Sequence, residues 1–202
     1  MKKSVNKLMN QEAELIKLAR AGDRSAQSEL VKTHSGRIYN LGLRIMRNEE
    51  DAEDVLQETF IIMLGKLDQF SGKSSLYTWL YRIATNIALQ KLREKKKLDA
   101  EISVHEPNFE ALRGSQLKEW PDHLEDKVND EQFRHCLAVA MQDLPENYRA
   151  VFVLRDMENL STKEAASVLN ISEANVKVRL MRARLFLRDK LANHLKCVGD
   201  IL

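Results

Sequence analysis

Residues 158–191 read ENLSTKEAASVLNISEANVKVRLMRARLFLRDKL, and their pattern indicates the architecture of the C-terminal part of the chain. Ser161 and Glu164 have the spacing of a capping box, which predicts a short helix that ends near Leu169. A tight turn follows, and Ser172 is a good cap for a longer helix. A short helix, a tight turn and a long basic helix together predict a helix-turn-helix.

The long helix at the end of this stretch has one apolar side and one basic side. Its predicted buried positions are Val176, Leu180, Ala183 and Leu187. The opposite side carries Lys177, Val178, Met181, Arg182 and Leu185, flanked by Arg184 and Arg188. Six basic residues stand against two acidic residues over positions 172–190. Such a helix after a turn is typical of a DNA major-groove reader, and the alternative is a basic helix in a plain bundle.

A second informative stretch is SLYTWLYRIATNIALQKLREKKK, residues 75–97. At about 100° per residue, its apolar stripe runs through Leu76, Leu80, Ile83 and Ile87. A neighbouring arc carries Trp79, Arg82, Asn86, Gln90 and Arg93. A ring followed by cations and amides can stack on an unpaired base, bond its edges and hold phosphates. The alternative is that Trp79 packs in a second layer of the domain, as most aromatic side chains on amphipathic helices do.

The helix expected over residues 51–67 has an acidic side instead. Its apolar arc comprises Val55, Leu56, Thr59, Ile62 and Met63. The other side gathers Asp51, Asp54, Gln57, Glu58 and Ile61. Because phosphate repels carboxylates, this surface favours a protein partner over DNA, and an ordinary solvated face is the alternative.

The chain of 202 residues has the composition of a soluble helical protein. Apolar residues make up 44% and charged residues 31%, while the small numbers of Gly (7) and Pro (3) favour helices over turn-rich strands. Residues 99–126 lack periodicity and carry eight acids against two bases, which predicts an extended, partly disordered segment. We therefore expect an all-α fold with two small helical domains, 5–97 and 128–195, joined by an acidic flexible linker at 98–127.

No enzyme motif, metal site or cofactor site is predicted. The five histidines show no paired ligand spacing, and the chain lacks a Gly-rich phosphate loop and a nucleophile elbow. Cys136 and Cys197 lie far apart without a CxxC, so we expect no disulfide framework, a core position for Cys136 and a free tail thiol at Cys197. Without a signal peptide or a long apolar run, we expect a cytoplasmic protein with no direct membrane insertion and no small-molecule substrate.

These segments occur in an order that resembles the bacterial sigma factors of the sigma-70 family, and among them the short extracytoplasmic-function (ECF) group. The matching segments are DAEDVLQETF (51–60), FSGKSSLYTWLYRIATNIALQKLR (70–93), LPENYRAVFVLRDMENLSTKEAASVL (144–169) and SEANVKVRLMRARLFL (172–187). The resemblance implies a non-enzymatic transcription initiation factor that makes core RNA polymerase promoter-specific. Residues 5–97 would form a region 2-like domain, and residues 128–195 a region 4-like domain.

The resemblance also implies three binding surfaces. The clamp coiled coil of core RNA polymerase would dock on Asp51, Asp54, Gln57 and Glu58. A flipped base of the −10 promoter strand would be captured by Ser71, Gly72, Lys73, Ser74, Ser75, Trp79, Arg82, Asn86 and Arg93. The −35 promoter DNA would contact Lys177, Val178, Met181 and Arg182 in its groove, with Arg155 and Thr162 near the phosphate backbone.

Further expectations follow from the same resemblance. The polymerase flap is a second expected contact of the factor, the acidic linker is expected to thread the RNA-exit path, and an anti-sigma factor is an expected partner. Val178 departs from the family pattern, since an apolar contact to a thymine methyl replaces a hydroxyl. A free-standing regulator that uses only the helix-turn-helix is the main alternative, although it would leave the acidic side and the Trp79 row unexplained.

Overall fold

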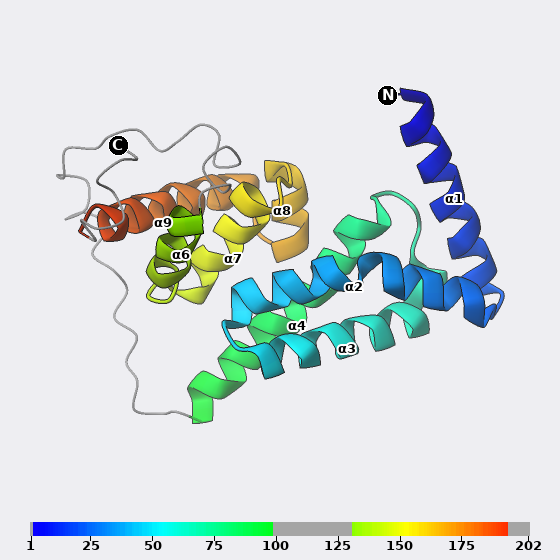
Figure 1. The fold of residues 1–202 in the computed structure, drawn as a ribbon, viewed down its shortest axis with the longest axis horizontal. Helices are drawn as coiled ribbons and strands as arrows, with labels where there is room; N and C mark the ends of the chain where they lie inside the picture. The colour runs from blue at the N-terminus through cyan, green and yellow to red at the C-terminus, as the bar shows by residue number, and fades with distance from the viewer. Residues whose placement is uncertain (1, 99–130, 194–202) are drawn as a thin grey trace. The chain divides into compact units, whose positions relative to one another are not determined.

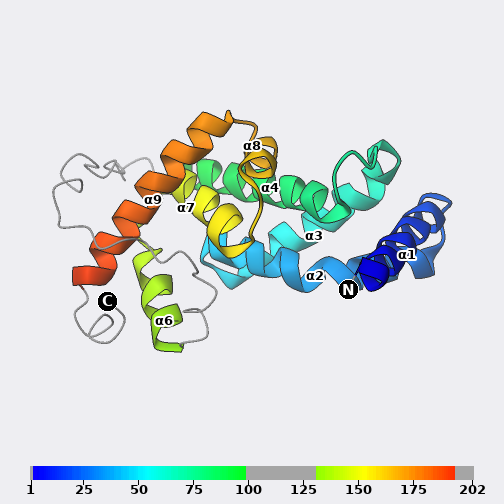
Figure 2. The ribbon, with the colours of Figure 1, turned by 90° about the horizontal axis from the view of Figure 1, so that it is seen from above.

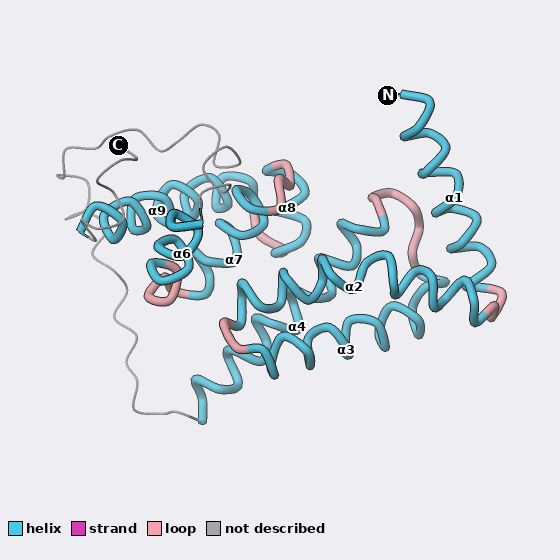
Figure 3. The backbone as a smooth tube through the Cα atoms, viewed as in Figure 1, coloured by secondary structure: helices cyan, strands magenta, loops and turns pink. Residues whose placement is uncertain are grey.

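The structure, a computed structural model, describes residues 2–98 and 131–193, and every regular element in these ranges is helical (Figure 1, Figure 3). The expected all-α fold is confirmed for these ranges. The chain divides into two compact units, and the division falls after Gln90. Residues 99–127 of the expected linker lie outside the described residues.

The first unit is built from long helices joined by short turns. Its elements are α1 (Lys2–Arg20), α2 (Arg24–Met46), α3 (Glu49–Lys66), the 3-10 turn η1 (Leu67–Gln69) and α4 (Leu76–Leu98), which begins here. Side-chain caps start both α2 and α3. The Asp23 carboxylate accepts hydrogen bonds from the first turn of α2, and the Asn48 side chain accepts from Asp51 N at 2.9 Å in α3.

Apolar side chains of α2, α3 and α4 form the core of this unit, and Figures 1 and 2 both show these three helices side by side. The large side chains that are 0% exposed are Leu41, Ile45, Val55, Met63, Leu80 and Tyr81. Helices α2 and α3 approach closely where Gly42 meets Ala52, because a Cβ at Gly42 would lie 3.3 Å from the Ala52 carbonyl oxygen. The absence of a side chain at Gly42 therefore allows the close spacing of this helix pair.

The second unit contains shorter helices around one long helix. Its elements are α6 (Glu131–Ala140), α7 (Glu146–Phe152), the π-helical turn η3 (Val153–Met157), α8 (Thr162–Leu169) and α9 (Glu173–Asn193). Its core is formed by Leu144, Phe152, Leu154, Val168, Val176 and Leu187, each at most 1% exposed. The π-helical turn at the end of α7 has no sequence signal and was not predicted.

The predicted helix-turn-helix is present as α8 and α9. Ser161 and Glu164 form the capping box of α8, and Ser172 Oγ accepts from Asn175 N at 3.2 Å at the start of α9. Between the helices, Asn170 takes a left-handed conformation with φ 53°, and its N–H bonds the Ala166 carbonyl. Asparagine tolerates this conformation better than most residues, so the sharp turn is encoded locally.

The structure describes one of the two cysteines. The Cys136 side chain is 2% exposed, which agrees with the core position expected for it. The predicted free thiol at Cys197 lies outside the described residues.

Candidate nucleic-acid and polymerase interfaces

An exposed loop leads into α4. Residues 71–75 are all exposed, and Gly72 has a positive φ of 70° that favours glycine. The loop ends at Ser75, whose hydroxyl accepts from Thr78 N at 3.1 Å and lies 2.9 Å from the Thr78 hydroxyl. Ser75 is thus the N-cap of α4, and the four residues before it present their polar groups to solvent.

The row of side chains predicted on α4 is exposed beyond its first member. Arg82, Asn86, Gln90 and Arg93 are all exposed, whereas the apolar stripe at Leu76, Leu80 and Ile87 is buried. Ile83, expected in that stripe, is only half-buried. The predicted separation of an apolar stripe and a polar row is therefore largely confirmed, and the polar row continues from the exposed loop.

Trp79 is partly packed against the domain and partly exposed, so it has features of both alternatives that the sequence left open, a packed ring and an accessible stacking surface. It is half-buried, and its ring packs against Phe70, with the ring centroids 5.3 Å apart and the planes tilted by 40°. Phe70 itself is 9% exposed. Trp79 is therefore supported from one side by a buried ring, while part of its surface remains accessible beside the loop at residues 71–75.

The acidic side of α3 is also present. Asp54, Gln57 and Glu58 are exposed and Asp51 is half-buried. Two apolar side chains lie on the same helix in an exposed setting, Ile61 at 70% and Leu64 at 39% exposure. Leu64 was not part of the predicted surface. Carboxylates next to exposed aliphatic side chains suit a protein partner with basic groups around an apolar centre.

The outer face of α9 shows the pattern predicted for it. Lys177 is exposed, Val178 is 44% exposed and Met181 is 42% exposed, while Val176, Leu180, Ala183 and Leu187 are buried. Arg182 is half-buried, with Nη1 3.4 Å from the Tyr148 hydroxyl. The exposed face thus mixes cations with apolar side chains, which suits contact with phosphates and thymine methyl groups.

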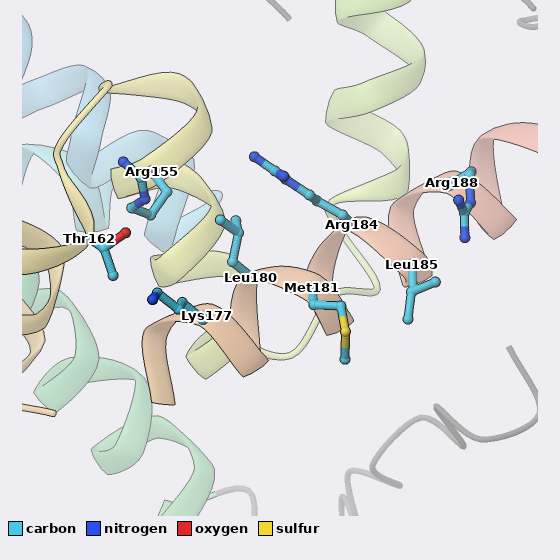
Figure 4. A pocket seen from close by; sticks show the side chains of 8 residues that line it. All are labelled: Arg155, Thr162, Lys177, Leu180, Met181, Arg184, Leu185 and Arg188. Atoms are coloured by element: carbon cyan, nitrogen blue, oxygen red, sulfur yellow. The ribbon is translucent and has the colours of Figure 1, made fainter. Parts of the chain in front are cut away.

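A hollow of about 420 Å³ opens beside this face (Figure 4). Arg155 of η3 and Thr162 of α8 lie on one side of the hollow, and α9 supplies the rest of its lining: Lys177, Leu180, Met181, Arg184, Leu185 and Arg188. The structure therefore brings the two predicted phosphate-contacting residues into one hollow with Lys177 and Met181, two of the four predicted groove-facing residues. Burial lowers the pKa of the Arg188 guanidinium, and the neighbouring Asp189 opposes that shift.

Two arginines around the hollow are held by the protein itself. Arg155 Nη1 donates to the Leu160 carbonyl, which bridges η3 to the start of α8. Arg184 makes two 2.7 Å bonds to the Asp156 carboxylate, whose side chain is only 5% exposed. Arg184, expected to flank the DNA-facing side, therefore braces α9 against η3. The sequence gave no hint of this pair, because 28 residues separate its members.

Arg20 is a further residue that sequence patterns do not reveal. It ends α1, and its guanidinium bonds the backbone at Leu67 and Phe70, next to the exposed loop. No periodicity or motif links positions 47 and 50 residues apart, so only the folded chain identifies the contact.

Neither a metal site nor a membrane-spanning helix is found among the described residues. Over residues 2–98 and 131–193, no cluster of three or more His, Cys, Asp or Glu side chains could hold a metal ion. No helix within the same ranges is long and apolar enough to cross a membrane.

Comparison with known protein families identifies the class of this chain. The model for sigma-70 region 2 matches residues 30–98, and the model for sigma-70 region 4 matches residues 134–187. ECF RNA polymerase sigma factor SigW of Bacillus subtilis (strain 168) is 35% identical over 179 residues, which cover 87% of this chain and 94% of the relative. The chain therefore belongs to the sigma-70 family of RNA polymerase sigma factors, which are not enzymes and direct the polymerase to promoters. Within that family it belongs to the ECF group.

Solved structures support the same fold. CnrH, solved in complex with the cytosolic domain of CnrY, is 25% identical with a TM-score of 0.60, covering 89% of this chain and 96% of CnrH. The sigma factor RpoE of Bartonella quintana, solved with the anti-sigma factor NepR, has a TM-score of 0.58 at 19% identity, covering 82% of this chain and 96% of RpoE. At that identity the second likeness concerns the fold alone.

Proposed function

We propose that this sigma factor recognises the −10 and −35 elements of its promoters with two separate surfaces and opens the DNA at the −10 element. The observation that carries the proposal is the exposed row on α4, which begins at the loop of residues 71–75 and continues through Arg82, Asn86 and Arg93. A protein that bound only duplex DNA through α9 would have no use for a second row of cations and amides beside a supported aromatic ring.

The chemistry of the α4 row fits an unpaired strand. Lys73, Arg82 and Arg93 are exposed cations suited to phosphates, and Asn86 offers both a donor and an acceptor to a base edge. Unstacking a base costs a few kcal/mol, which stacking and edge contacts in the capture site must offset. The loop residues Ser71, Gly72, Ser74 and Ser75 add hydroxyl and backbone groups around the position that the flipped base would take.

The helix-turn-helix is the proposed −35 reader. Lys177, Val178, Met181 and Arg182 of α9 would enter the major groove, and Arg155 and Thr162 would approach phosphates at the edge of the hollow. Val178 and Met181 supply apolar contact, so thymine methyl groups are the expected base features at their positions.

Core RNA polymerase would be captured through α3. Asp51, Asp54, Gln57 and Glu58 form an acidic surface that would meet the clamp coiled coil, and the exposed Ile61 would fill an apolar contact at its centre. The flap is the proposed contact for the C-terminal domain, residues 128–195. The acidic linker, residues 98–127, would follow the RNA-exit path, where its negative charge would mimic RNA.

An anti-sigma factor is the proposed regulatory partner of this cytoplasmic protein. CnrH, which resembles this chain along most of its length, was solved in complex with the cytosolic domain of another protein. The exposed apolar side chains on α3 and α9, notably Ile61, Val178 and Met181, would suit such a partner. A partner that covers these side chains would block the polymerase-binding and DNA-binding surfaces together.

Run-off transcription with core RNA polymerase on a genomic promoter library tests the whole proposal. We expect transcription that depends on this chain and shares two sequence elements at a constant spacing upstream of the start sites. Promoter binding by the isolated chain, combined with no stimulation of core polymerase, would instead identify a free-standing regulator.

A further inference from the structure

The guanidinium of Arg20 joins α1 to the segment that precedes the exposed loop. Its Nε donates to the Leu67 carbonyl at 3.0 Å, and its Nη2 donates to the Phe70 carbonyl. These two carbonyls belong to the first residue of η1 and to the residue that follows it. Because the guanidinium is planar and rigid, its two donors hold both ends of η1 at one spacing.

Phe70 is consequently restrained at three points. Its N–H bonds the Leu67 carbonyl at 3.1 Å, its own carbonyl accepts from Arg20, and its ring packs on Trp79. Since Phe70 is 9% exposed, a shift of its backbone would move the buried ring. A change at Arg20 therefore reaches Trp79 through Phe70.

The opposite end of the loop is anchored locally. Ser75 caps α4, so this end moves with the helix that carries the Trp79 row. Residues 71–74 between the two anchors are exposed, and Gly72 allows the tip its left-handed turn. Of these two anchors, only Arg20 comes from a helix distant in the sequence.

We propose that Arg20 is a positioning residue for capture of the −10 base: it holds the Phe70 end of the loop without touching DNA. This inference rests on the proposed role of the loop and the Trp79 row in promoter opening. Binding sites lose selectivity when their supporting groups loosen by a fraction of an ångström, even where the contact residues are intact. Loss of the two Arg20 hydrogen bonds should therefore lower discrimination for the captured base more than it lowers binding of the polymerase.

The experiment compares two fluorescent single-stranded oligonucleotides bound by the reconstituted holoenzyme. One carries the non-template −10 sequence found by run-off transcription, and the other has an abasic site at the base whose removal weakens wild-type binding most. Arg20→Ala removes both hydrogen bonds, and Arg20→Lys keeps the charge without the planar fork. Arg24→Ala is the matched control, because Arg24 is an exposed arginine four residues further along.

We expect the wild-type holoenzyme to prefer the intact oligonucleotide by ~5-fold to ~150-fold, the range typical of base stacking. Arg20→Ala should reduce this ratio by about threefold or more, Arg20→Lys should reduce it less, and Arg24→Ala should leave it unchanged. Capture of core polymerase should stay within about twofold of wild type for all variants. If Arg20→Ala does not fold, as judged by circular dichroism, the inference is tested by the ratio of intact to abasic oligonucleotide binding for Arg20→Lys.

Two results would overturn the inference in distinguishable ways. If Arg20 variants bind both oligonucleotides more weakly by one common factor, Arg20 only stabilises the fold, and the proposed function survives. If the wild-type holoenzyme shows no preference at any abasic position, the loop does not capture a base, and the proposed function fails together with the inference.

Discussion

Arg182 and Arg184 lie two residues apart on α9, yet we propose opposite roles for them. Arg182 lies on the proposed DNA-facing side, with its Nη1 3.4 Å from the Tyr148 hydroxyl. Arg184 bonds both oxygens of the Asp156 carboxylate. We predict that Arg182→Ala weakens DNA binding with little loss of stability, and that Arg184→Ala does the reverse.

The expected magnitude for Arg184→Ala follows from the burial of its partner. The Asp156 side chain is 5% exposed and would lose both of its 2.7 Å bonds to Arg184. Leaving one buried charge unpaired costs about 3–5 kcal/mol. Because Arg184 is 38% exposed and water can enter the vacated space, we discount this to about 2–3 kcal/mol of unfolding free energy. For a domain of this size that lowers the melting temperature by about 10–20 °C.

For Arg182→Ala, the expected change is in the affinity for DNA and in the salt dependence of that affinity. A lost phosphate contact reduces the slope of log K against log salt by about 0.9, whereas a lost base contact lowers affinity by about 1–3 kcal/mol at constant slope. Either result would place Arg182 at the DNA. Arg184→Ala should leave both the slope and the affinity of the folded fraction close to wild type.

Two measurements separate these outcomes. Native-state hydrogen exchange of peptides from α7 to α9 reports the local unfolding free energy, so that the first unit does not obscure the result. Holoenzyme binding to a −35 duplex between 50 and 200 mM salt reports the slope. The double variant Arg184→Ala with Asp156→Ala should recover part of the lost stability. The reasoning is refuted if Arg184→Ala changes the salt slope while α9 keeps wild-type exchange.

Four further results are expected. Trp79→Ala should reduce promoter opening, seen by permanganate footprinting, more than it reduces polymerase binding; an equal loss of both would remove its assigned role. Asp54→Ala should weaken capture of core polymerase in a pull-down, and intact capture would contradict the assigned interface. Gly42→Ala should lower the unfolding free energy by about 1–3 kcal/mol in a thermal melt, because its Cβ would press on the α3 backbone at 3.3 Å. Burial lowers the pKa of His34 from 6.5, against the opposing effect of Glu12 at 3.2 Å, so the neutral imidazole is favoured in the fold. His34 should therefore stabilise the fold above about pH 6.5 and lose that contribution as the pH falls below it, and His34→Gln should flatten this part of the stability–pH curve.

The parts of the fold that sequence could predict are those encoded by neighbours along the chain. The helix-turn-helix depends on the capping box at Ser161, the left-handed Asn170 and the cap at Ser172, all within twelve residues. The two faces of α4 depend on helical spacing alone, so the exposure of Arg82 and Asn86 followed from geometry.

The parts that sequence could not predict depend on contacts between distant segments. The Arg184–Asp156 pair, the Arg20 hydrogen bonds and the ring contact of Trp79 with Phe70 all form when separate segments meet. Helical spacing predicted that Trp79 lies between the buried and exposed sides of α4. How much of the Trp79 ring is covered depends on the position of Phe70, which spacing does not give. The roles of these side chains towards DNA and polymerase remain predictions.

Glycine suits position 72 because of the left-handed backbone conformation there, and not because a side chain would lack space. Apart from Gly72 and its two chain neighbours, no atom lies within 4 Å of the place where a Cβ would be added, so an L-residue at φ 70° would be strained only by crowding between its Cβ and the adjacent backbone. A D-alanine introduced by chemical ligation would adopt the same torsion comfortably while removing the backbone freedom that glycine has in the unfolded chain. D-alanine at position 72 would thus show whether promoter opening requires only the left-handed conformation of the loop tip or also its backbone flexibility. Retained activity would indicate the first, and lost activity the second.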